Sequence, residues 1–415
     1  MIELSLQPQD FLFFKDSRPM LGASPGKGAR VPMQHVLNGA LHAALHRAFP
    51  QAGSLEGEKI HQGAGGDFRF GNLTSIGPFF SHVGDDNWAF PTPLDLCTSS
   101  GEISHVPLSK LPDASSLPAP LRHHVVSRHS PTKEDRKPFL DRLGFQDYLN
   151  GKVVEKDRLH CFDEYFLPEH AVGIGMDNDT RSVEKGMLYT FERMRLREEA
   201  RLVSYADFEL NGKDGLQELF HDQNRILVGG ESRVCTVETK SVSNLNLPSP
   251  SQISGTRIKF ILLTPAIFVA VSGHSGGWLP NWVSPMDGSF RLLDGPGPDK
   301  VRRLRRKSPG IKEGRPIDAR LVAAHVGKPE IVSGWAKGPN GGAKSTLMAA
   351  PAGSVYYFEA SDEEHAQKLV SALNWKPNLK ENTQSINRRS ALMGEKGYGI
   401  GVCSSWQFLE EINSK

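Results

Sequence analysis

The N-terminal residues alternate between apolar and polar side chains. Ile2, Leu4 and Leu6 are separated by polar residues, and a period of two predicts a half-buried strand. From Pro32 to about Phe49 the apolar residues recur instead with a helical period, which predicts an amphipathic helix. Its apolar face would consist of Val36, Leu37, Leu41, Ala44, Leu45 and Ala48.

The rest of the first half consists of a stretch without regular periodicity followed by strand-like and helical patterns. Residues 50–165 are rich in Gly, Pro, Ser and His, which predicts short strands and long insertions. Strand-like patterns return in HAVGIGMDNDTRSVEKGMLYTFERMRL and in RLVSYADFEL, before a short helical stretch, DGLQELFHDQ. In RILVGGESRVCTVE, two glycines precede an apolar strand. Residues 241–255 have almost no core-forming periodicity, so we interpret them as a linker.

The second half begins with TRIKFILLTPAIFVAV, which predicts one long strand. Ser361 and Glu364 have the spacing of a capping box before a helix. The apolar face of that helix would consist of Ala366, Leu369, Val370 and Leu373. A glycine-rich loop and a last strand follow in MGEKGYGIGVCSSW.

Both halves therefore start with a strand and finish with a helix, a glycine loop and a strand. This weak repeat predicts an α+β fold of two ferredoxin-like (RRM-like) domains with long insertions. The first domain would span residues 1–240 with an insertion at about 50–165. After the linker, the second would span residues 256–415 and include a basic loop at 302–320.

Composition fits a soluble globular protein. The chain has 415 residues, 38% of them hydrophobic and 23% charged, which is ordinary for such a protein. Its four cysteines stand far apart without a C-x-x-C pair, which argues against a zinc ribbon and a disulfide scaffold. There is no apolar run long enough for a bilayer and no basic, apolar signal peptide. We expect a cytoplasmic protein without metal, cofactor or membrane partner.

Charge is concentrated in one segment. The net charge of the chain is +2, whereas residues 302–320, RRLRRKSPGIKEGRPIDAR, hold eight basic and two acidic residues. The proline and glycine content predicts a mobile loop. Such a run can be a solvated surface or a phosphate-binding footprint. Both interpretations stay open, and under the second one Arg302, Arg303, Arg305 and Arg306 would contact RNA.

The stretch KGPNGGAKST, residues 337–346, looks like a phosphate-binding loop. Gly338, Lys344 and Ser345 fit G-x-x-x-x-G-K-[ST], but Ala343 replaces the last glycine. A true loop of this type follows a buried strand and starts a helix. Here a poor strand end precedes Gly338, and Pro351 follows too soon for a long helix. We therefore expect a connection between two strands and no ATP hydrolysis.

The predicted first helix carries three histidines, His35, His42 and His46. Two histidines four residues apart can share a metal, but no third ligand and no H-E-x-x-H glutamate is present. A histidine there could act as general acid and base in an RNA-cleaving site. The simpler interpretation is a polar helix face directed at water or a partner chain.

Glycine loops are the stronger indication of function. In EKGYGIGVC, Gly397, Gly399 and Gly401 alternate before a strand and would allow another backbone to approach closely. Lys396 and Tyr398 would add a charge and a ring for stacking. The alternative is a tight turn that enters a buried strand.

Four stretches together resemble a known family. They are FLFFKDSRPM, GIGMDNDTRSVEKGMLYTFERMRL, LVGGESR with its following strand, and PAGSVYYFE ahead of GYGIGVC. In this order they resemble RAMP-superfamily proteins of CRISPR systems, specifically the subunit of the type III-B (Cmr) effector complex at the 5′ end of the CRISPR RNA. The stretch 50–165 matches nothing in that family.

The resemblance implies two ferredoxin-like domains and a non-catalytic role. Such a subunit would bind the 5′ tag of the CRISPR RNA and join the large polymerase-like subunit to the RAMP backbone subunits. Glycine loops, basic side chains and aromatic rings suit single-stranded RNA ends. The alternative within the superfamily is an endoribonuclease that processes precursor CRISPR RNA with His42 or His46.

Carried over by position, the resemblance implies four groups of site residues. The glycine loop with RNA contacts would be Lys396, Gly397, Tyr398, Gly399 and Gly401. Its counterpart in the first domain would be Gly229, Gly230 and Arg233. Arg181, Lys185 and Tyr189 would contact the tag, and Asp16 and Arg18 would shape the site or an interface.

Overall fold

The computed structural model describes residues 1–15, 28–50, 70–99, 102–105, 108–110, 117–125, 137–177, 179–250, 252–271, 273–274, 276–297, 312–336, 342–377 and 385–408. It is a mixed structure of antiparallel sheets with few helices, as expected for an α+β protein. Every ladder between its named strands is antiparallel.

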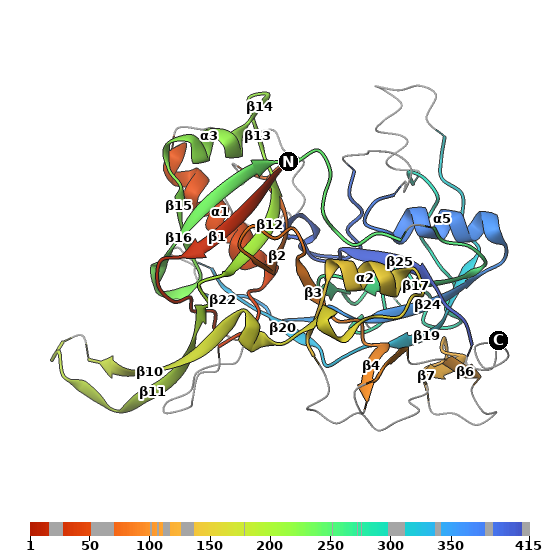
Figure 1. Ribbon diagram of the computed structural model, residues 1–415, viewed down its shortest axis with the longest axis horizontal. Coiled ribbons are helices and arrows are strands. Elements are labelled where there is room, and N and C mark those ends of the chain that lie inside the picture. Colours follow the sequence, from red (N-terminus) through yellow and green to blue (C-terminus); the bar gives the residue numbers. More distant parts are fainter. Residues whose placement is uncertain are drawn as a thin grey trace.

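The first half is built on an eight-stranded sheet (Figure 1). Its order is β15 (Arg225–Val228), β16 (Arg233–Ser241), β1 (Ile2–Pro8), β12 (Ala200–Asp207), β2 (Thr74–His82), β3 (Ala89–Pro91), β8 (Phe139–Asp141) and β9 (Leu159–His160). The alternation in β1 places Ile2, Leu4 and Leu6 in the core with at most 1% exposed surface. Segment 50–165 therefore contributes four of the strands rather than a separate unit.

Helices cover this sheet. α1 (Gln34–Ala48) and α3 (Gly215–Asp222) lie over it, whereas α2 (Arg142–Leu149) follows β8. The predicted apolar face of α1 is largely confirmed, because Leu37, Leu41, Ala44 and Leu45 are buried in one cluster with β1. Asp214 begins α3 by accepting hydrogen bonds from two backbone amides of its first turn, which satisfies donors that the helix itself leaves unpaired.

The second half contains a four-stranded sheet in the order β19 (Ala319–His325), β24 (Val355–Ala360), β17 (Arg257–Leu262) and β25 (Gly401–Ser405). α5 (Glu363–Leu373) packs on it. The N-cap of α5 is Asp362, whose Oδ1 accepts from the amide of His365 at 2.8 Å. The predicted Ser361–Glu364 capping box is therefore wrong, since Glu364 pairs with Lys368 instead.

The long strand predicted over residues 256–271 is also wrong. It is two strands, β17 and β18 (Ala266–Ile267), in different sheets. Between them the amides of Leu263 and Thr264 donate to the carbonyl of Ile400, and Pro265 has no amide to donate. Tertiary hydrogen bonds thus interrupt a pattern that is apolar throughout.

Small sheets complete the structure. β18 pairs with β23 (Leu347–Ala350), and β23 pairs with β20 (Glu330–Val332). The two-stranded sheets are β10 (Phe166–Met176) with β11 (Val183–Leu196), β13 (Glu209–Leu210) with β14 (Lys213–Asp214), β21 (Trp335–Ala336) with β22 (Gly342–Ala343), β4 (Leu96–Ser99) with β5 (Glu102–His105), and β6 (Leu108–Lys110) with β7 (His123–Val125). The single-turn 3-10 segments are η1 (Lys156–Arg158), η2 (Phe162–Glu164), η3 (Gly230–Ser232) and η4 (Gly394–Lys396).

The stretch KGPNGGAKST lies at β21 and β22, with residues 337–341 outside the described part of the chain. β22 ends at Ala343, and the next element after Lys344 is the strand β23. A phosphate-binding loop would require a helix there. The expectation that this stretch connects strands is confirmed.

The two halves share a hydrophobic core. Phe79 of β2 and Val203 of β12 belong to the same buried cluster as Ile261 of β17 and Val402 of β25. In chain order β1, α1, β2, β12, α3 and β16 follow the ferredoxin-like pattern. The first sheet has further strands, and the described residues between β17 and β19 contain no helix. Two separate ferredoxin-like domains, with the boundaries given above, therefore stay a prediction.

Candidate nucleic-acid interface

The glycines of the loop between η4 and β25 face the protein itself. A Cβ at Gly397 would lie 2.9 Å from the carbonyl oxygen of Ser75 in β2, and one at Gly399 would lie closer than 3.0 Å to the backbone of Ser390. A Cβ at Gly401 would meet the ring of Phe260 at a similarly short distance. Glycine is needed here because protein backbone, rather than a ligand, occupies the space of the side chain.

Tyr398 is buried with no exposed surface, so a base cannot stack on its ring in this conformation. Its hydroxyl lies 2.7 Å from Nδ1 of His35 on α1, and the two rings stack. The role of Tyr398 as a stacking platform is therefore corrected: this tyrosine joins the glycine loop of the second half to a helix of the first.

The histidine face of α1 packs inward as well. Burial, together with the positive charges of Lys396 and Lys344, lowers the pKa of His35 to about 4. Burial, and to a smaller extent the charge of Lys396, lowers the pKa of His42 to about 4 as well. His46 packs edge-on against Phe70. Lys396 is itself half-buried, and burial lowers its pKa. In the described structure these histidines are partly buried against protein, so the expectation that the face meets water is corrected, and a contact with a partner chain stays a prediction.

In the first glycine loop, which follows β15, protein atoms again occupy the space that a side chain would take. Gly229 has a φ of +76°, and a Cβ there would lie 2.6 Å from the carbonyl oxygen of Phe13. A Cβ at Gly230 would lie 2.7 Å from the ring of Phe13. Both glycines thus allow η3 to pack on the segment that follows β1.

Arg233, predicted to contact RNA, belongs to a compact cluster beside this loop. Its guanidinium lies 3.7 Å from the centre of the Phe11 ring and forms ion pairs with Glu231 and Asp10. The guanidinium of Arg193 lies 3.8 Å from the centre of the same ring. Phe11 is only 5% exposed, and both guanidiniums pack against its ring.

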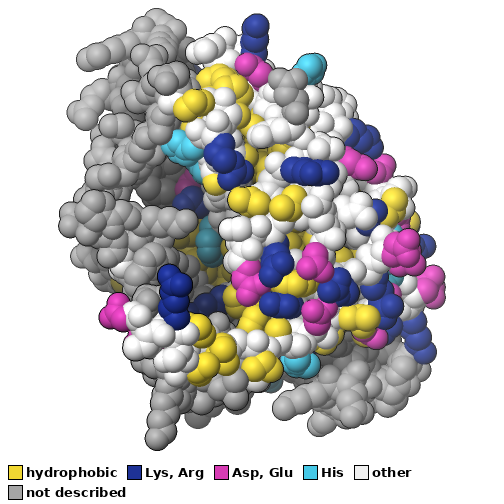
Figure 2. Space-filling model, turned by 90° about the vertical axis from the view of Figure 1, so that its left-hand side faces the viewer, with side chains coloured by type: hydrophobic (Ala, Val, Ile, Leu, Met, Phe, Trp, Pro, Cys, Tyr) yellow, Lys and Arg dark blue, Asp and Glu magenta, His cyan; other side chains and the backbone are white. Residues whose placement is uncertain are grey.

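We call this group the arginine cluster: Arg193, Arg195, Arg233, Asp10, Glu169 and Glu231. Arg195 bonds to Glu169 at 2.7 Å and to Asp10 at 3.1 Å. Three arginines meet three carboxylates, so the cluster has no net charge to attract phosphates. Figure 2 shows the same interleaving of Lys and Arg with Asp and Glu on the side of the molecule that carries hairpin β10–β11.

The hairpin β10–β11 projects from the body of the molecule at one end of its long axis (Figure 1). One face of it is apolar and open: Val172 is 66% exposed, Ile174 47% and Met176 51%. At the turn, Oδ1 of Asp177 accepts from the amide and hydroxyl of Thr180. Arg181 follows with a φ of +53° and is exposed. The turn thus presents Arg181 together with the carboxylates of Asp177 and Asp179 beyond an apolar stripe.

The remaining predicted residues are only partly placed. Lys185 and Tyr189 lie in β11, and their side chains are outside the described structure. Asp16 and Arg18, and the basic residues Arg302, Arg303, Arg305 and Arg306, also lie outside the described residues.

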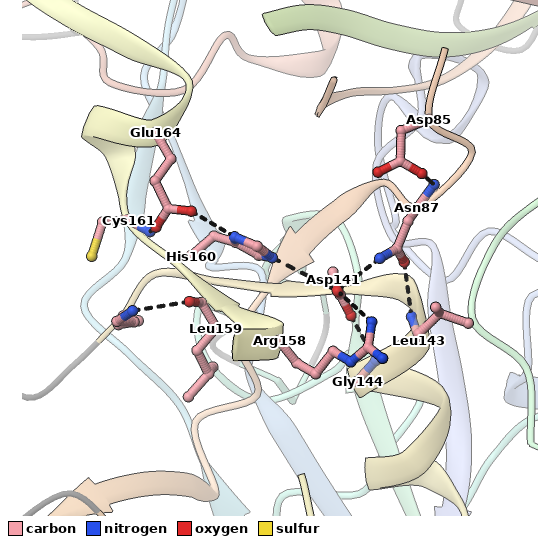
Figure 3. A network of polar contacts seen from close by, with 11 residues as sticks. Asp85, Asn87, Asp141, Leu143, Gly144, Arg158, Leu159, His160, Cys161 and Glu164 are labelled. Carbon is pink, nitrogen blue, oxygen red and sulfur yellow. Dashed lines mark hydrogen bonds and ion pairs between the residues drawn. The ribbon is translucent and has the colours of Figure 1, made fainter. Parts of the chain in front are cut away.

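A polar network holds the root of the hairpin (Figure 3). Nδ1 of His160 lies 2.7 Å from Glu164, and its Nε2 lies 3.7 Å from Asp141. Hydrogen bonds to these two carboxylates raise the pKa of His160 despite its partial burial. Asp141 also caps α2 through the amide of Gly144 and accepts from Asn87. Since Glu164 ends η2 directly before β10, the network fixes the direction in which the hairpin leaves the sheet.

Sequence reasoning missed the arginine cluster. A signal was present, because Arg193 and Arg195 are two residues apart in a strand and therefore share a face. Their carboxylate partners at residues 10, 169 and 231 are distant in sequence, so pairing could not be deduced. The network at His160 left no comparable signal, because its members come from three separate segments, around residues 87, 141 and 160.

Among the described residues, no helix is long and apolar enough to cross a membrane. The described residues also contain no group of three or more His, Cys, Asp or Glu side chains that could hold a metal ion.

Three solved structures are similar to the chain. One, a type III-B Cmr-beta complex bound to cognate target RNA, is 14% identical over 86% of both chains, with a TM-score of 0.43. A Csm3–Csm4 subcomplex of the type III-A interference complex is 10% identical over 88% of this chain and 94% of the other, with a TM-score of 0.40. A Csm1–Csm4 cassette in complex with AMPPNP is 11% identical over 87% and 88%, with a TM-score of 0.33. These values are too low to support an assignment.

No curated protein matches the sequence. The sequence profile of the family described as CRISPR-associated protein (Cas_Cmr3), by contrast, matches residues 4–402. That match includes both sheets, both glycine loops and the hairpin, and it confirms the resemblance found in the four sequence stretches. The chain therefore belongs to the Cas_Cmr3 family of CRISPR-associated proteins.

Proposed function

We propose that the chain is a non-catalytic RNA-binding subunit of a type III-B CRISPR effector complex. It would hold the 5′ tag of the CRISPR RNA and bridge the large polymerase-like subunit to the RAMP backbone subunits. The observation that carries this proposal is the family match over residues 4–402. In guide complexes generally, base pairing reads the target while protein holds the geometry of the guide.

The hairpin β10–β11 supports RNA binding on physical grounds. An exposed apolar stripe is unusual on a soluble chain and indicates a binding surface. Bases of single-stranded RNA can pack on apolar side chains, while a cation such as Arg181 at the turn meets a phosphate. The carboxylates of the arginine cluster pair with its cations at the root, whereas Arg181 at the turn has no ion pair among the described residues.

The proposed contacts change accordingly. Arg181, Lys185, Tyr189 and Lys396 stay proposed RNA contacts, as do the four arginines of residues 302–306. The glycines, Tyr398 and Arg233 instead maintain the shape of the loops, since their neighbours are protein atoms. Asp16 and Arg18 stay proposed as residues that shape the site or an interface.

A non-catalytic role fits the position of the histidines. A general acid and base for RNA cleavage must reach the scissile phosphate. His35 is occupied by Tyr398, and burial favours the neutral form of His42. Incubation of the pure chain with repeat RNA should therefore give no specific cleavage, whereas cleavage lost in His42→Ala would support the endoribonuclease.

RNA binding is tested with the exposed cation at the hairpin turn. Arg181→Glu in the assembled complex should weaken binding of RNA that carries the 5′ tag by roughly tenfold, because a charge-assisted contact to phosphate becomes a repulsion. Lys328→Glu makes the same charge change at an exposed position between β19 and β20 and should have no effect. Equal affinities of the two variants would reject the hairpin as the binding element.

A further inference from the structure

A pocket of about 500 Å³ lies between the C-terminal half of α5 and residues 291–297. Its lining includes three cationic side chains, Arg291, Lys368 and Arg389, and one acidic side chain, Asp294. α5 and hairpin β10–β11 lie toward opposite ends of the long axis of the molecule (Figure 1). The pocket is therefore remote from the hairpin.

Among the residues that the structure describes, the guanidinium of Arg389 has no carboxylate partner. Its Nε donates to the carbonyl of Ala372, and Nη2 donates to Oδ1 of Asn387 at 3.1 Å. Both acceptors are neutral, and no ion pair connects Arg389 to a carboxylate of the described residues. Burial lowers its pKa to about 10, so it stays charged at neutral pH. A largely buried cation without a counter-ion favours an anion in the space beside it.

The other charges at the pocket leave the balance positive. Lys368 lies between Asp294 at 3.6 Å and Glu364 at 2.6 Å, so its charge is already compensated. Arg291 is exposed and has no ion pair within the described part of the chain. Two cations, Arg291 and Arg389, are thus available to a ligand.

The rim of the pocket anchors both ends of the basic segment. The amide of Gly314 donates to the carbonyl of Pro296, and the amide of Arg315 donates to Oδ1 of Asp294. The sequence between Gly297 and Lys312 contains six basic residues and one acidic residue. The described residues on either side of this basic stretch therefore lie at the rim of the pocket.

We propose that this pocket binds a phosphate group of an RNA backbone, as a second RNA contact separate from the hairpin. Arg291 and Arg389 would each donate to the phosphate oxygens, since a guanidinium presents parallel donors that suit this geometry. The inference goes beyond tag binding, because neither the tag sequence nor the hairpin is required.

The test uses the full-length chain and a fluorescent single-stranded RNA without repeat sequence. Arg291→Glu should weaken binding roughly tenfold at low salt, and Arg291→Ala should reduce the slope of log K against log salt by about 0.7, the value for one phosphate contact on a single strand. Lys328→Glu is the matched control and should match the wild type. Arg389→Lys is a second variant that keeps the charge but loses the paired donors, and it should also weaken binding.

The outcomes distinguish a failure of the pocket proposal from a failure of the proposed function. If both Arg291→Glu and Arg389→Lys bind the RNA with wild-type affinity, the proposal that the pocket binds RNA phosphate is overturned. If Arg181→Glu then still weakens binding of tagged RNA, the proposed function stands without it. Thermal unfolding in inorganic phosphate distinguishes the source of the phosphate. Stabilisation by inorganic phosphate that Arg291→Glu abolishes, with RNA affinity unchanged, would assign the pocket to free phosphate and overturn the RNA proposal.

Discussion

Gly399→Ala should destabilise the chain far more than a change of one methyl group suggests. Gly399 has a φ of +75°, where an alanine costs about 1–2 kcal/mol relative to glycine. A Cβ there would also lie closer than 3.0 Å to the backbone of Ser390. The amide of Arg389 donates to the carbonyl of Gly399 at 2.7 Å, so the two segments cannot separate without losing a hydrogen bond. Such overpacking costs roughly 1–3 kcal/mol.

The matched control is Gly277→Ala in the same half of the chain. Gly277 has a φ of +80°, and a Cβ there would meet nothing within 4 Å. Gly277→Ala therefore carries only the conformational cost of a positive φ, about 1–2 kcal/mol. The difference between the two variants therefore isolates the steric contribution of about 1–3 kcal/mol.

Urea unfolding followed by tryptophan fluorescence measures this difference. The midpoint should fall in both variants and clearly further in Gly399→Ala, with a similar slope in both. Equal midpoints would refute the inward-facing glycine loop. The loop would then have free space beside Gly399, as required if a ligand backbone approached it.

Three further predictions follow from the side-chain contacts. His160→Gln should lower the free energy of unfolding by roughly 1.5–3 kcal/mol, with a loss that is full below the ordinary histidine pKa of about 6.5. This loss should disappear as pH rises through the raised pKa of His160, where the wild-type histidine loses its proton. Unfolding curves measured from pH 5 to 9 test this, and a loss of stability that is constant with pH would contradict it. Lys259→Met should cost about 3–5 kcal/mol because it leaves Asp95, only 2% exposed, without its ammonium partner; Lys259→Met with Asp95→Leu should recover part of the loss in urea unfolding. Phe11→Ala should expose the guanidiniums of the arginine cluster and cost about 3–5 kcal/mol, and wild-type stability in differential scanning calorimetry would show that the stack contributes nothing.

Elements with a local signal could be predicted from the sequence. β1 and α1 follow directly from apolar periods of two and of 3.6. The predicted face of β1 is buried, and that of α1 is buried at Leu37, Leu41, Ala44 and Leu45 but not at Ala48. The break between β17 and β18 could not be predicted, because it depends on hydrogen bonds to Ile400, more than 130 residues away. An apolar pattern does not encode which amide bonds to which distant carbonyl.

The candidate site shows the same limit. The glycine positions were recognisable, yet their meaning depends on what occupies the missing Cβ. For Gly397 that neighbour is Ser75, in the other half of the chain. The sequence predicts that the histidine face of α1 meets water or a partner chain, because a polar face usually does. In the structure the glycine loop instead supplies Tyr398 as a partner for His35. Burial of polar side chains between the halves is a tertiary property without a local pattern.

The most direct test of the account is nuclease protection of the CRISPR RNA in purified effector complexes assembled with and without this chain. With the chain, we expect the 5′ tag to resist digestion. Without it, the tag should be digested while the guide region covered by the backbone subunits stays protected. Equal protection of the tag in both complexes would contradict the proposal that this chain holds it.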